Sequence, residues 1–176
     1  MIRRSAAAAA VGLALGLVAG VGACTTPADT LDTTATERAV ERTVEPRLPV
    51  RVDEVRCPSP IERRDGATTT CRAVLADEGG SVRVNVTQRG DGQRLEVELY
   101  DVVLDRAAVG RQLHDALVSE YARSFTVDCG GRGVAVLATG ASISCTATDD
   151  AGRRKVSATV LDARGTLRFD LSGAGA

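Results

Sequence analysis

Four cysteines, arranged in two pairs, constrain the fold of this 176-residue chain more than any other feature. Cys57 and Cys71 form the first pair along the sequence, and Cys129 and Cys145 form the second. Each pair encloses a loop of about 15 residues, which is far longer than the Cys-x-x-Cys spacing of zinc and redox sites. An even set of cysteines at this spacing indicates structural disulfides if the chain is exported.

The sequences around the two pairs are similar to each other. Residues 66–71 align with residues 140–145, and Cys57 and Cys129 each follow a valine by two positions. Each pair is followed by two segments in which apolar and polar residues alternate, with Gly- and Asp-containing turns between them, which is the pattern of strands buried on one face. We interpret the two stretches of chain, each with its own cysteine pair and alternating segments, as tandem copies. Their apolar positions correspond as Val82, Val84 and Val86 with Val156, Ala158 and Val160, and as Leu95, Val97 and Leu99 with Leu167, Phe169 and Leu171.

A helical pattern precedes the strands of each copy. In the first copy, Thr34 to Glu37 resembles a capping box and Pro46 ends the helix. In the second, apolar residues recur at helical spacing between Asp105 and Arg123. The sequence therefore predicts an α+β fold of two tandem repeats, each with one helix packed on a roughly four-stranded antiparallel sheet and one intra-repeat disulfide. We place the repeats at residues 34–100 and 101–172, with 101–105 as a short link and 173–176 as a tail.

Each copy contains its own pair of cysteines, which favours disulfides within each copy. Cys71 and Cys145 share the parity of the apolar residues of their strands, so both are expected to face the core. We expect Cys57 to pair with Cys71 and Cys129 to pair with Cys145, and pairing between the copies is the alternative. Closing a loop of this length contributes about 3 kcal/mol in the chain-entropy model, which is a large share of the stability of a small unit.

The N-terminus has the anatomy of an export signal. Arg3 and Arg4 precede an apolar run of small residues that ends at Ala23 and Cys24, which resembles the signal of a bacterial lipoprotein. In such a signal residues 1–23 are removed, and Cys24 receives a diacylglyceryl group and becomes the new N-terminus. The alternative is an uncleaved anchor, for which the run is marginally hydrophobic. We expect residues 24–33 to be a flexible tether and the remaining chain to be extracytoplasmic, lipid-anchored to the outer face of the cell membrane.

Charge and composition exclude several classes of function. The chain has 22 Lys and Arg against 23 Asp and Glu and a net charge of −1, so it lacks the concentrated positive charge that nucleic-acid binding needs. Aromatic residues make up 2% of the chain and Trp is absent, which argues against base-stacking and aromatic sugar-binding surfaces. We therefore expect the partners to be the membrane and an envelope protein, and no nucleic acid.

The chain offers little material for catalysis or metal binding. His114 is its single histidine, and Asp115 follows it. Adjacent helix residues point about 100° apart, so we do not expect this carboxylate to orient His114 as a base, and we interpret His114 as a partly exposed helix residue. Glu96 and Glu98 fall on outward strand positions, where solvation explains them. We predict no catalytic residue, metal site or cofactor and expect no enzyme, with a hydrolase based on carboxylates as a remaining alternative.

The first copy resembles a known family. Its stretch Val55-Arg56-Cys57-Pro58-Ser59-Pro60-Ile61, residues 65–71 and the two alternating strands are similar to the actinobacterial domain of unknown function 4333, found in exported lipoproteins and membrane-anchored proteins. The second copy has Gly130 after its first cysteine in place of Pro58, and a longer loop at 131–139. The resemblance implies an extracytoplasmic helix-plus-sheet module with a disulfide, and it implies no activity.

Two functions are compatible with this organisation. The main prediction is a non-enzymatic, membrane-anchored protein-interaction module of the cell envelope, with inhibition of an envelope hydrolase as one version. The alternative is a carrier that holds an apolar or lipid ligand between helix and sheet, where the small inward residues Ala73, Ala147 and Ala158 can leave space.

Overall fold

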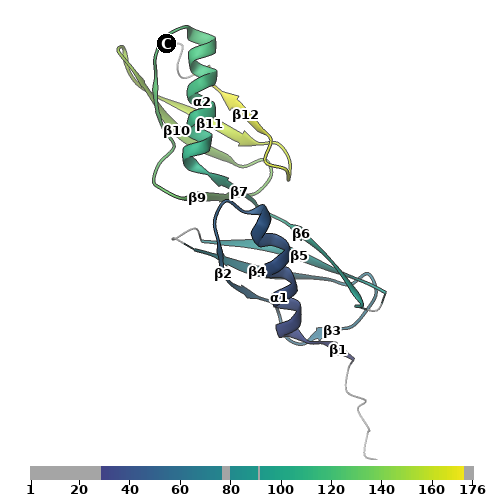
Figure 1. The fold of residues 1–176 in the computed structure, drawn as a ribbon. Coiled ribbons are helices and arrows are strands. Elements are labelled where there is room, and N and C mark those ends of the chain that lie inside the picture. The colour runs from purple at the N-terminus through teal and green to yellow at the C-terminus, as the bar shows by residue number, and fades with distance from the viewer. Residues whose placement is uncertain (1–28, 77–79, 91, 173–176) are drawn as a thin grey trace, which may run out of the picture.

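The computed structural model of the protein describes residues 29–76, 80–90 and 92–172, and Figure 1 shows a mixed α/β fold with antiparallel sheets. We call residues 29–101 the first half and residues 102–172 the second half. Within the described residues, each half has one α-helix lying across a four-stranded sheet (Figure 1). The combination of helices, antiparallel sheets and two disulfides expected from the sequence is confirmed. The predicted signal at 1–23, the lipidation site Cys24 and the tail at 173–176 lie outside the described residues.

The first half builds its core between a helix and one sheet face. Helix α1 (Thr33–Val44) continues into a 3-10 turn, η1 (Glu45–Arg47). Val40 and Val44 of α1 pack on the inward valines of β5, of which Val82 and Val84 are fully buried. The strands β2 (Val52–Arg56), β4 (Thr68–Leu75), β5 (Ser81–Arg89) and β6 (Arg94–Leu99) form the sheet in the order β2-β4-β5-β6, and β1 (Thr30–Leu31) pairs with β3 (Ile61–Glu62).

The second half follows the same element order. Leu113 and Leu117 of its helix α2 (Arg106–Tyr121) are fully buried and pack in a core with Ala147 and Val156. The sheet order is β8-β10-β11-β12. A separate two-stranded sheet pairs β7, which precedes the helix, with β9, which follows it. The strands are β7 (Val102–Asp105), β8 (Thr126–Asp128), β9 (Val134–Leu137), β10 (Ser142–Asp149), β11 (Gly152–Val160) and β12 (Leu167–Asp170).

The structure corrects two predictions for the beginning of α1. The capping box at Thr34 is wrong, because the cap is Asp32, whose carboxylate accepts the N–H of Ala35 at 2.9 Å. A short carboxylate at this position satisfies one of the N–H groups that the first helical turn leaves unpaired. The tether predicted at 24–33 is also shorter than expected, because β1 lies within it and its Leu31 is buried.

The segment expected as a link at 101–105 is mostly the strand β7. It pairs antiparallel with β9, and Figure 1 places this two-stranded ribbon at the junction of the two halves. Val103 and Val134 pack against the core of the first half, whereas Leu104 and Ala135 pack in the core of the second half. Successive side chains of a strand point to opposite faces, so the ribbon contributes to both cores at once and fixes the halves against each other.

The register of β5 relative to β11 also differs from the predicted one. Cys71 is paired with Val84 in one sheet, and Cys145 is paired with Val156 in the other. Val84 therefore corresponds to Val156, and the predicted match of Val82 with Val156 is shifted by one inward position. The shift arises because the hairpin between β4 and β5 is longer than the hairpin between β10 and β11.

Candidate functional site

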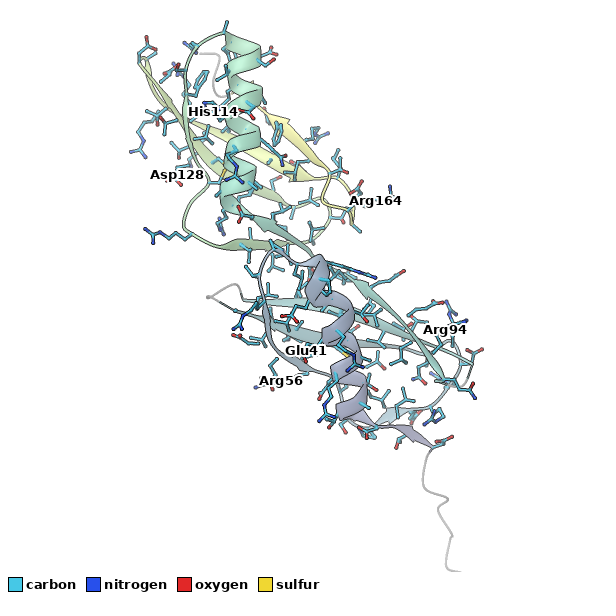
Figure 2. All side chains as sticks on the ribbon, viewed as in Figure 1. Glu41, Arg56, Arg94, His114, Asp128 and Arg164 are labelled. Atoms are coloured by element: carbon cyan, nitrogen blue, oxygen red, sulfur yellow. A yellow bond between two sulfur atoms is a disulfide. The ribbon has the colours of Figure 1, made fainter. Side chains whose placement is uncertain are left out.

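A surface groove in the second half brings charged side chains next to a buried disulfide. It has a volume of about 580 Å³ and lies between α2 and the segment that follows β8. Arg106, Gly110 and His114 line it from the helix, and Cys129 and Arg132 line it from the other side. Figure 2 labels His114, on α2, and Asp128, at the end of β8, which is a further lining residue.

Local sequence explains both walls of the groove. Asp105 begins the helical wall, because its carboxylate accepts the N–H of Ala108 at 2.6 Å as the N-cap of α2. In the opposite wall Gly130, Gly131 and Gly133 all have φ between 69° and 78°, a region that favours glycine. The glycine-rich segment 130–133 therefore turns the chain back from Cys129 toward β9.

Arg106 ties the helix to this loop. Its Nη1 donates to the carbonyl of Cys129 at 2.9 Å, and its Nε donates to the carbonyl of Val134 at 3.3 Å. The carbonyls of Cys129 and Val134 lie at the two ends of the glycine-rich segment 130–133, so the Arg106 guanidinium binds both ends of this segment. Arg111 and Arg132 are exposed on the rim, and together with Arg106 they outnumber the lining carboxylates of Asp105 and Asp128.

The disulfides lie where the sequence analysis expected them. Cys57–Cys71 and Cys129–Cys145 have Cα–Cα distances of 4.3 Å and 4.0 Å, and each joins the residue after the first strand of a four-stranded sheet to the neighbouring strand. Both bonds lie within one half of the molecule. Pairing between the halves, the alternative left open by the sequence, is not what the structure shows.

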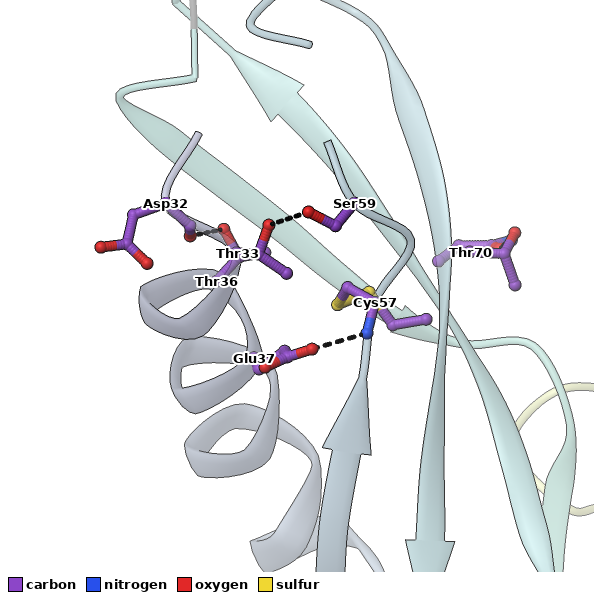
Figure 3. The surroundings of a disulfide bond; sticks show 9 residues. Asp32, Thr33, Thr36, Glu37, Cys57, Ser59 and Thr70 are labelled. Carbon is purple, nitrogen blue, oxygen red and sulfur yellow. Dashed lines mark hydrogen bonds between the residues drawn. A yellow bond between two sulfur atoms is a disulfide. The ribbon is translucent and has the colours of Figure 1, made fainter. Parts of the chain in front are cut away.

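Two side chains of α1 form hydrogen bonds with the segment that contains Cys57 of the first disulfide. The N–H of Cys57 donates to Oε1 of Glu37 at 2.9 Å, and Oγ1 of Thr33 donates to Oγ of Ser59 at 3.3 Å (Figure 3). From the sequence, Glu37 was expected in a capping box, and its contact with Cys57 was not predicted. The available signal was the spacing of Glu37, which lies five residues after the true cap Asp32 and reaches the N–H of Cys57.

His114 and Asp115 do contact each other, contrary to the sequence-based expectation. Nδ1 of His114 lies 3.0 Å from Oδ1 of Asp115. The expectation failed because both side chains are exposed, at 44% and 80%, and can rotate toward each other from adjacent helix positions. The exposure predicted for His114 is confirmed, and Glu96 and Glu98 are exposed as expected.

The buried side chain of Asp101 forms an ion pair with the partly exposed side chain of Arg83 at the end of the first half. Nε and the backbone N–H of Arg83 donate to Oδ2 of Asp101 at 3.0 Å and 2.9 Å. The side-chain hydrogen bond from Arg83 lowers the pKa of Asp101, and it outweighs burial, which acts in the opposite direction. The pair fixes the chain where it leaves β6, and it lies outside the groove.

The described residues contain no group of three or more His, Cys, Asp or Glu side chains that could hold a metal ion. None of their helices is both long and apolar enough to cross a membrane.

Comparison with known proteins identifies a domain in the first half. A family model described as "Domain of unknown function (DUF4333)" matches residues 19–92, from before the described residues to the turn after β5. The match includes α1 and the first disulfide, and the second half lies outside it. No curated protein and no solved structure matches the chain. The resemblance of the first segment is therefore confirmed, and the chain contains a DUF4333 domain.

Proposed function

We propose that this protein is a membrane-anchored, extracytoplasmic lipoprotein that acts as a non-enzymatic protein-interaction module of the cell envelope. The proposed anchor is a diacylglyceryl group on Cys24, after removal of residues 1–23. Its support is the order of basic residues, small apolar run and cysteine at the N-terminus. Two disulfides agree with an oxidising compartment outside the cytoplasm.

We further propose that the two halves are tandem copies of one ancestral unit. In support, both have the order strand, helix, then five strands, and both arrange the last strands in the same sheet order. Asp32 and Asp105 cap the two helices in the same way, each through the N–H three residues later. The disulfides also join equivalent strands.

The β7–β9 ribbon is the observation that carries the interaction role. Because its two faces contribute to two different cores, the halves present their surfaces in a fixed relation. A preorganised surface binds a partner with a smaller entropic cost than two freely moving modules. Inhibition of an envelope hydrolase is one form that such binding can take, by analogy of architecture alone.

The carrier function is the weaker proposal. It needs space beside the small inward residues of the sheets, but Ala73, Ala147 and Ala158 are at most 1% exposed and belong to the packed hydrophobic clusters. Leu113 and Leu117 fill the helix side of the second cluster. No observation within the described residues favours a ligand at these positions over ordinary core packing.

Two measurements test the main proposal. Mass spectrometry of the mature protein should find Cys24 as the N-terminal residue with a diacylglyceryl mass, and a Cys24→Ser variant should lose this modification and leave the membrane fraction. Crosslinking on intact cells, followed by purification of the full chain, should recover the same envelope protein in repeated experiments. An unmodified Cys24 would contradict the anchor, and the absence of a recurring partner across several growth conditions would contradict the interaction role.

A further inference from the structure

The two halves differ at one position that decides whether the space beside the disulfide is filled. Glu37 lies five residues after the cap Asp32, and Gly110 lies five residues after the cap Asp105. In the first half the Glu37 carboxylate reaches across and accepts the N–H of Cys57 at 2.9 Å (Figure 3). In the second half Gly110 has no side chain with which to do the same for Cys129.

The missing side chain coincides with the groove. Gly110 is buried and lines it, and a Cβ built on Gly110 would lie 3.7 Å from the carbonyl oxygen of Val127 and 3.8 Å from Sγ of Cys129. These are ordinary van der Waals distances, so a Cβ fits there without a clash. Glycine weakens a helix interior relative to alanine, and here neither backbone conformation nor crowding calls for it. Gly110 therefore leaves room for a Cβ on the wall of the groove, at the position where the first half has Glu37.

The charges around the space favour an anion. Arg111 and Arg132 line the groove, and the described residues give neither guanidinium an ion pair. The two lining carboxylates keep their charge, and each accepts a backbone N–H: Asp105 caps α2, and Asp128 accepts the N–H of Gly130 at 2.9 Å. With three arginines (Arg106, Arg111 and Arg132) against two carboxylates, the lining has an excess of positive charge, which favours a negative group in the groove.

We propose that this groove binds a carboxylate side chain from an acidic segment of a partner protein. The carboxylate occupies the place beside Gly110 that Glu37 fills in the first half, accepts the N–H of Cys129, and pairs with Arg111 and Arg132 at the rim. The first half thus contains a covalently attached model of the contact, made by its own Glu37. This inference rests on the proposed interaction function and assigns it a site and a chemistry.

Amide NMR of the full chain tests the site directly. The probes are the blocked peptides acetyl-Gly-Glu-Glu-Gly-amide and acetyl-Gly-Gln-Gln-Gly-amide, together with inorganic phosphate. The Glu peptide should shift the Cys129 amide resonance in a saturable manner, and the Gln peptide should bind at least tenfold more weakly. The Cys57 amide is an internal control that should not move, because Glu37 already occupies its N–H.

Two charge-matched variants separate the site from a general charge effect. Gly110→Glu should supply the carboxylate internally, shift the Cys129 amide without peptide and weaken Glu-peptide binding at least tenfold. Ser119→Glu adds the same charge to an exposed position of α2 outside the groove and should bind as the wild type does. Arg132→Gln, a rim change that leaves the helix intact, should weaken binding severalfold and provides the test if Gly110→Glu does not fold.

Several results would overturn the proposal. They are a Cys129 amide that the Glu peptide does not move, equal binding of the Glu and Gln peptides, and wild-type binding by Gly110→Glu or, if that variant does not fold, by Arg132→Gln. Phosphate binding as tight as that of the Glu peptide would make the groove a general anion site and overturn the carboxylate assignment. A cellular partner captured equally by the wild type and Gly110→Glu would contradict the groove site and leave the interaction function standing. Finding no partner would contradict the proposed function itself.

Discussion

Gln88 shows how a single buried polar residue shapes the first half. Once the strands are aligned by their pairing with β4 and β10, Gln88 occupies on β5 the position that Val160 occupies on β11. It is 1% exposed, and its side chain forms hydrogen bonds with the backbone of the segment around β3. Oε1 accepts the N–H of Arg64 at 3.0 Å, and Nε2 donates to the carbonyl of Glu62 at 2.8 Å. The glutamine therefore supports a segment whose backbone groups lie beyond the four-stranded sheet.

Replacing Gln88 by Val should lower the free energy of unfolding by about 1–3 kcal/mol. The reason is the loss of partners for two backbone groups, not a loss of volume, because Val160 fits the equivalent position. Urea denaturation measures the change. Glu98→Gln, on the exposed face of β6, is the control and should change stability by less than about 0.5 kcal/mol. A Gln88→Val protein as stable as the wild type would show that these hydrogen bonds contribute nothing.

Asp101 gives the fold a dependence on pH. Arg83 lowers the pKa of Asp101 in the folded protein, so the stabilisation is present above the unfolded-state pKa of about 4 and is lost as the pH falls through the folded-state value. Asp101→Asn should cost about 1–2 kcal/mol at pH 7, toward the low end because the Arg83 side chain is 44% exposed to screening water. Urea denaturation from pH 7 to pH 2.5 should show the difference between wild type and variant shrinking below about pH 4. A difference that is constant over this range would contradict the role of the ion pair.

At the scale of elements, the long strands were predictable and the short ones were not. The alternation through Val82, Val84 and Val86 identified β5, because one buried face imposes a period of two. β1 and β3 have two residues each, and β7 and β9 have four, which is too short for a periodic signal. Both partners of each pair are far apart in sequence, so local propensity cannot reveal them.

The groove was only partly accessible from the sequence. The sequence predicted a loop at 131–139, but the arrangement of segment 130–133 around Arg106 depends on two backbone carbonyls that only the folded chain brings together. The contrast between Glu37 and Gly110 could be read from the sequence once the true caps were known. The mistaken cap at Thr34 concealed it, since it shifted the helix register by two residues.

Each disulfide should stabilise its own half to a similar extent. Cys57→Ala with Cys71→Ala, and separately Cys129→Ala with Cys145→Ala, should each lower the free energy of unfolding by about 3 kcal/mol, because the closed loops have nearly equal lengths of about 15 residues. Urea denaturation of the two double variants measures this, and each serves as the control for the other. A loss below about 1 kcal/mol in either would contradict the entropic contribution assigned to that bond.

At the scale of the whole molecule, the two halves share part of their cores. Val134 belongs to the second half by sequence, yet it is buried among residues of the first half, together with the partly buried Val103 and Val136. On the other face of the same ribbon, Leu104 and Ala135 contact the second core. Unfolding of either half therefore removes packing from the other, and the structure predicts that they unfold cooperatively.

Val134→Asp should destabilise the first half although the substitution lies in the second. It places an unpaired carboxylate in an apolar core, which should cost about 3 kcal/mol. Hydrogen exchange followed by mass spectrometry should show faster exchange in β4 and β5. Val118→Asp is a matched control, because Val118 is 37% exposed on α2, and it should leave exchange in the first half unchanged. Exchange that increases only in the second half would mean that the halves are independent.

In the proposed function, a protein partner at the membrane contacts the second half beside Gly110. The most direct test is crosslinking in intact cells that express the wild type, Gly110→Glu or Ser119→Glu at equal levels, followed by identification of the bound proteins. We predict that the same envelope protein is recovered with the wild type and with Ser119→Glu and is reduced at least tenfold with Gly110→Glu. Equal recovery with all three chains, or recovery with none, would contradict the claim.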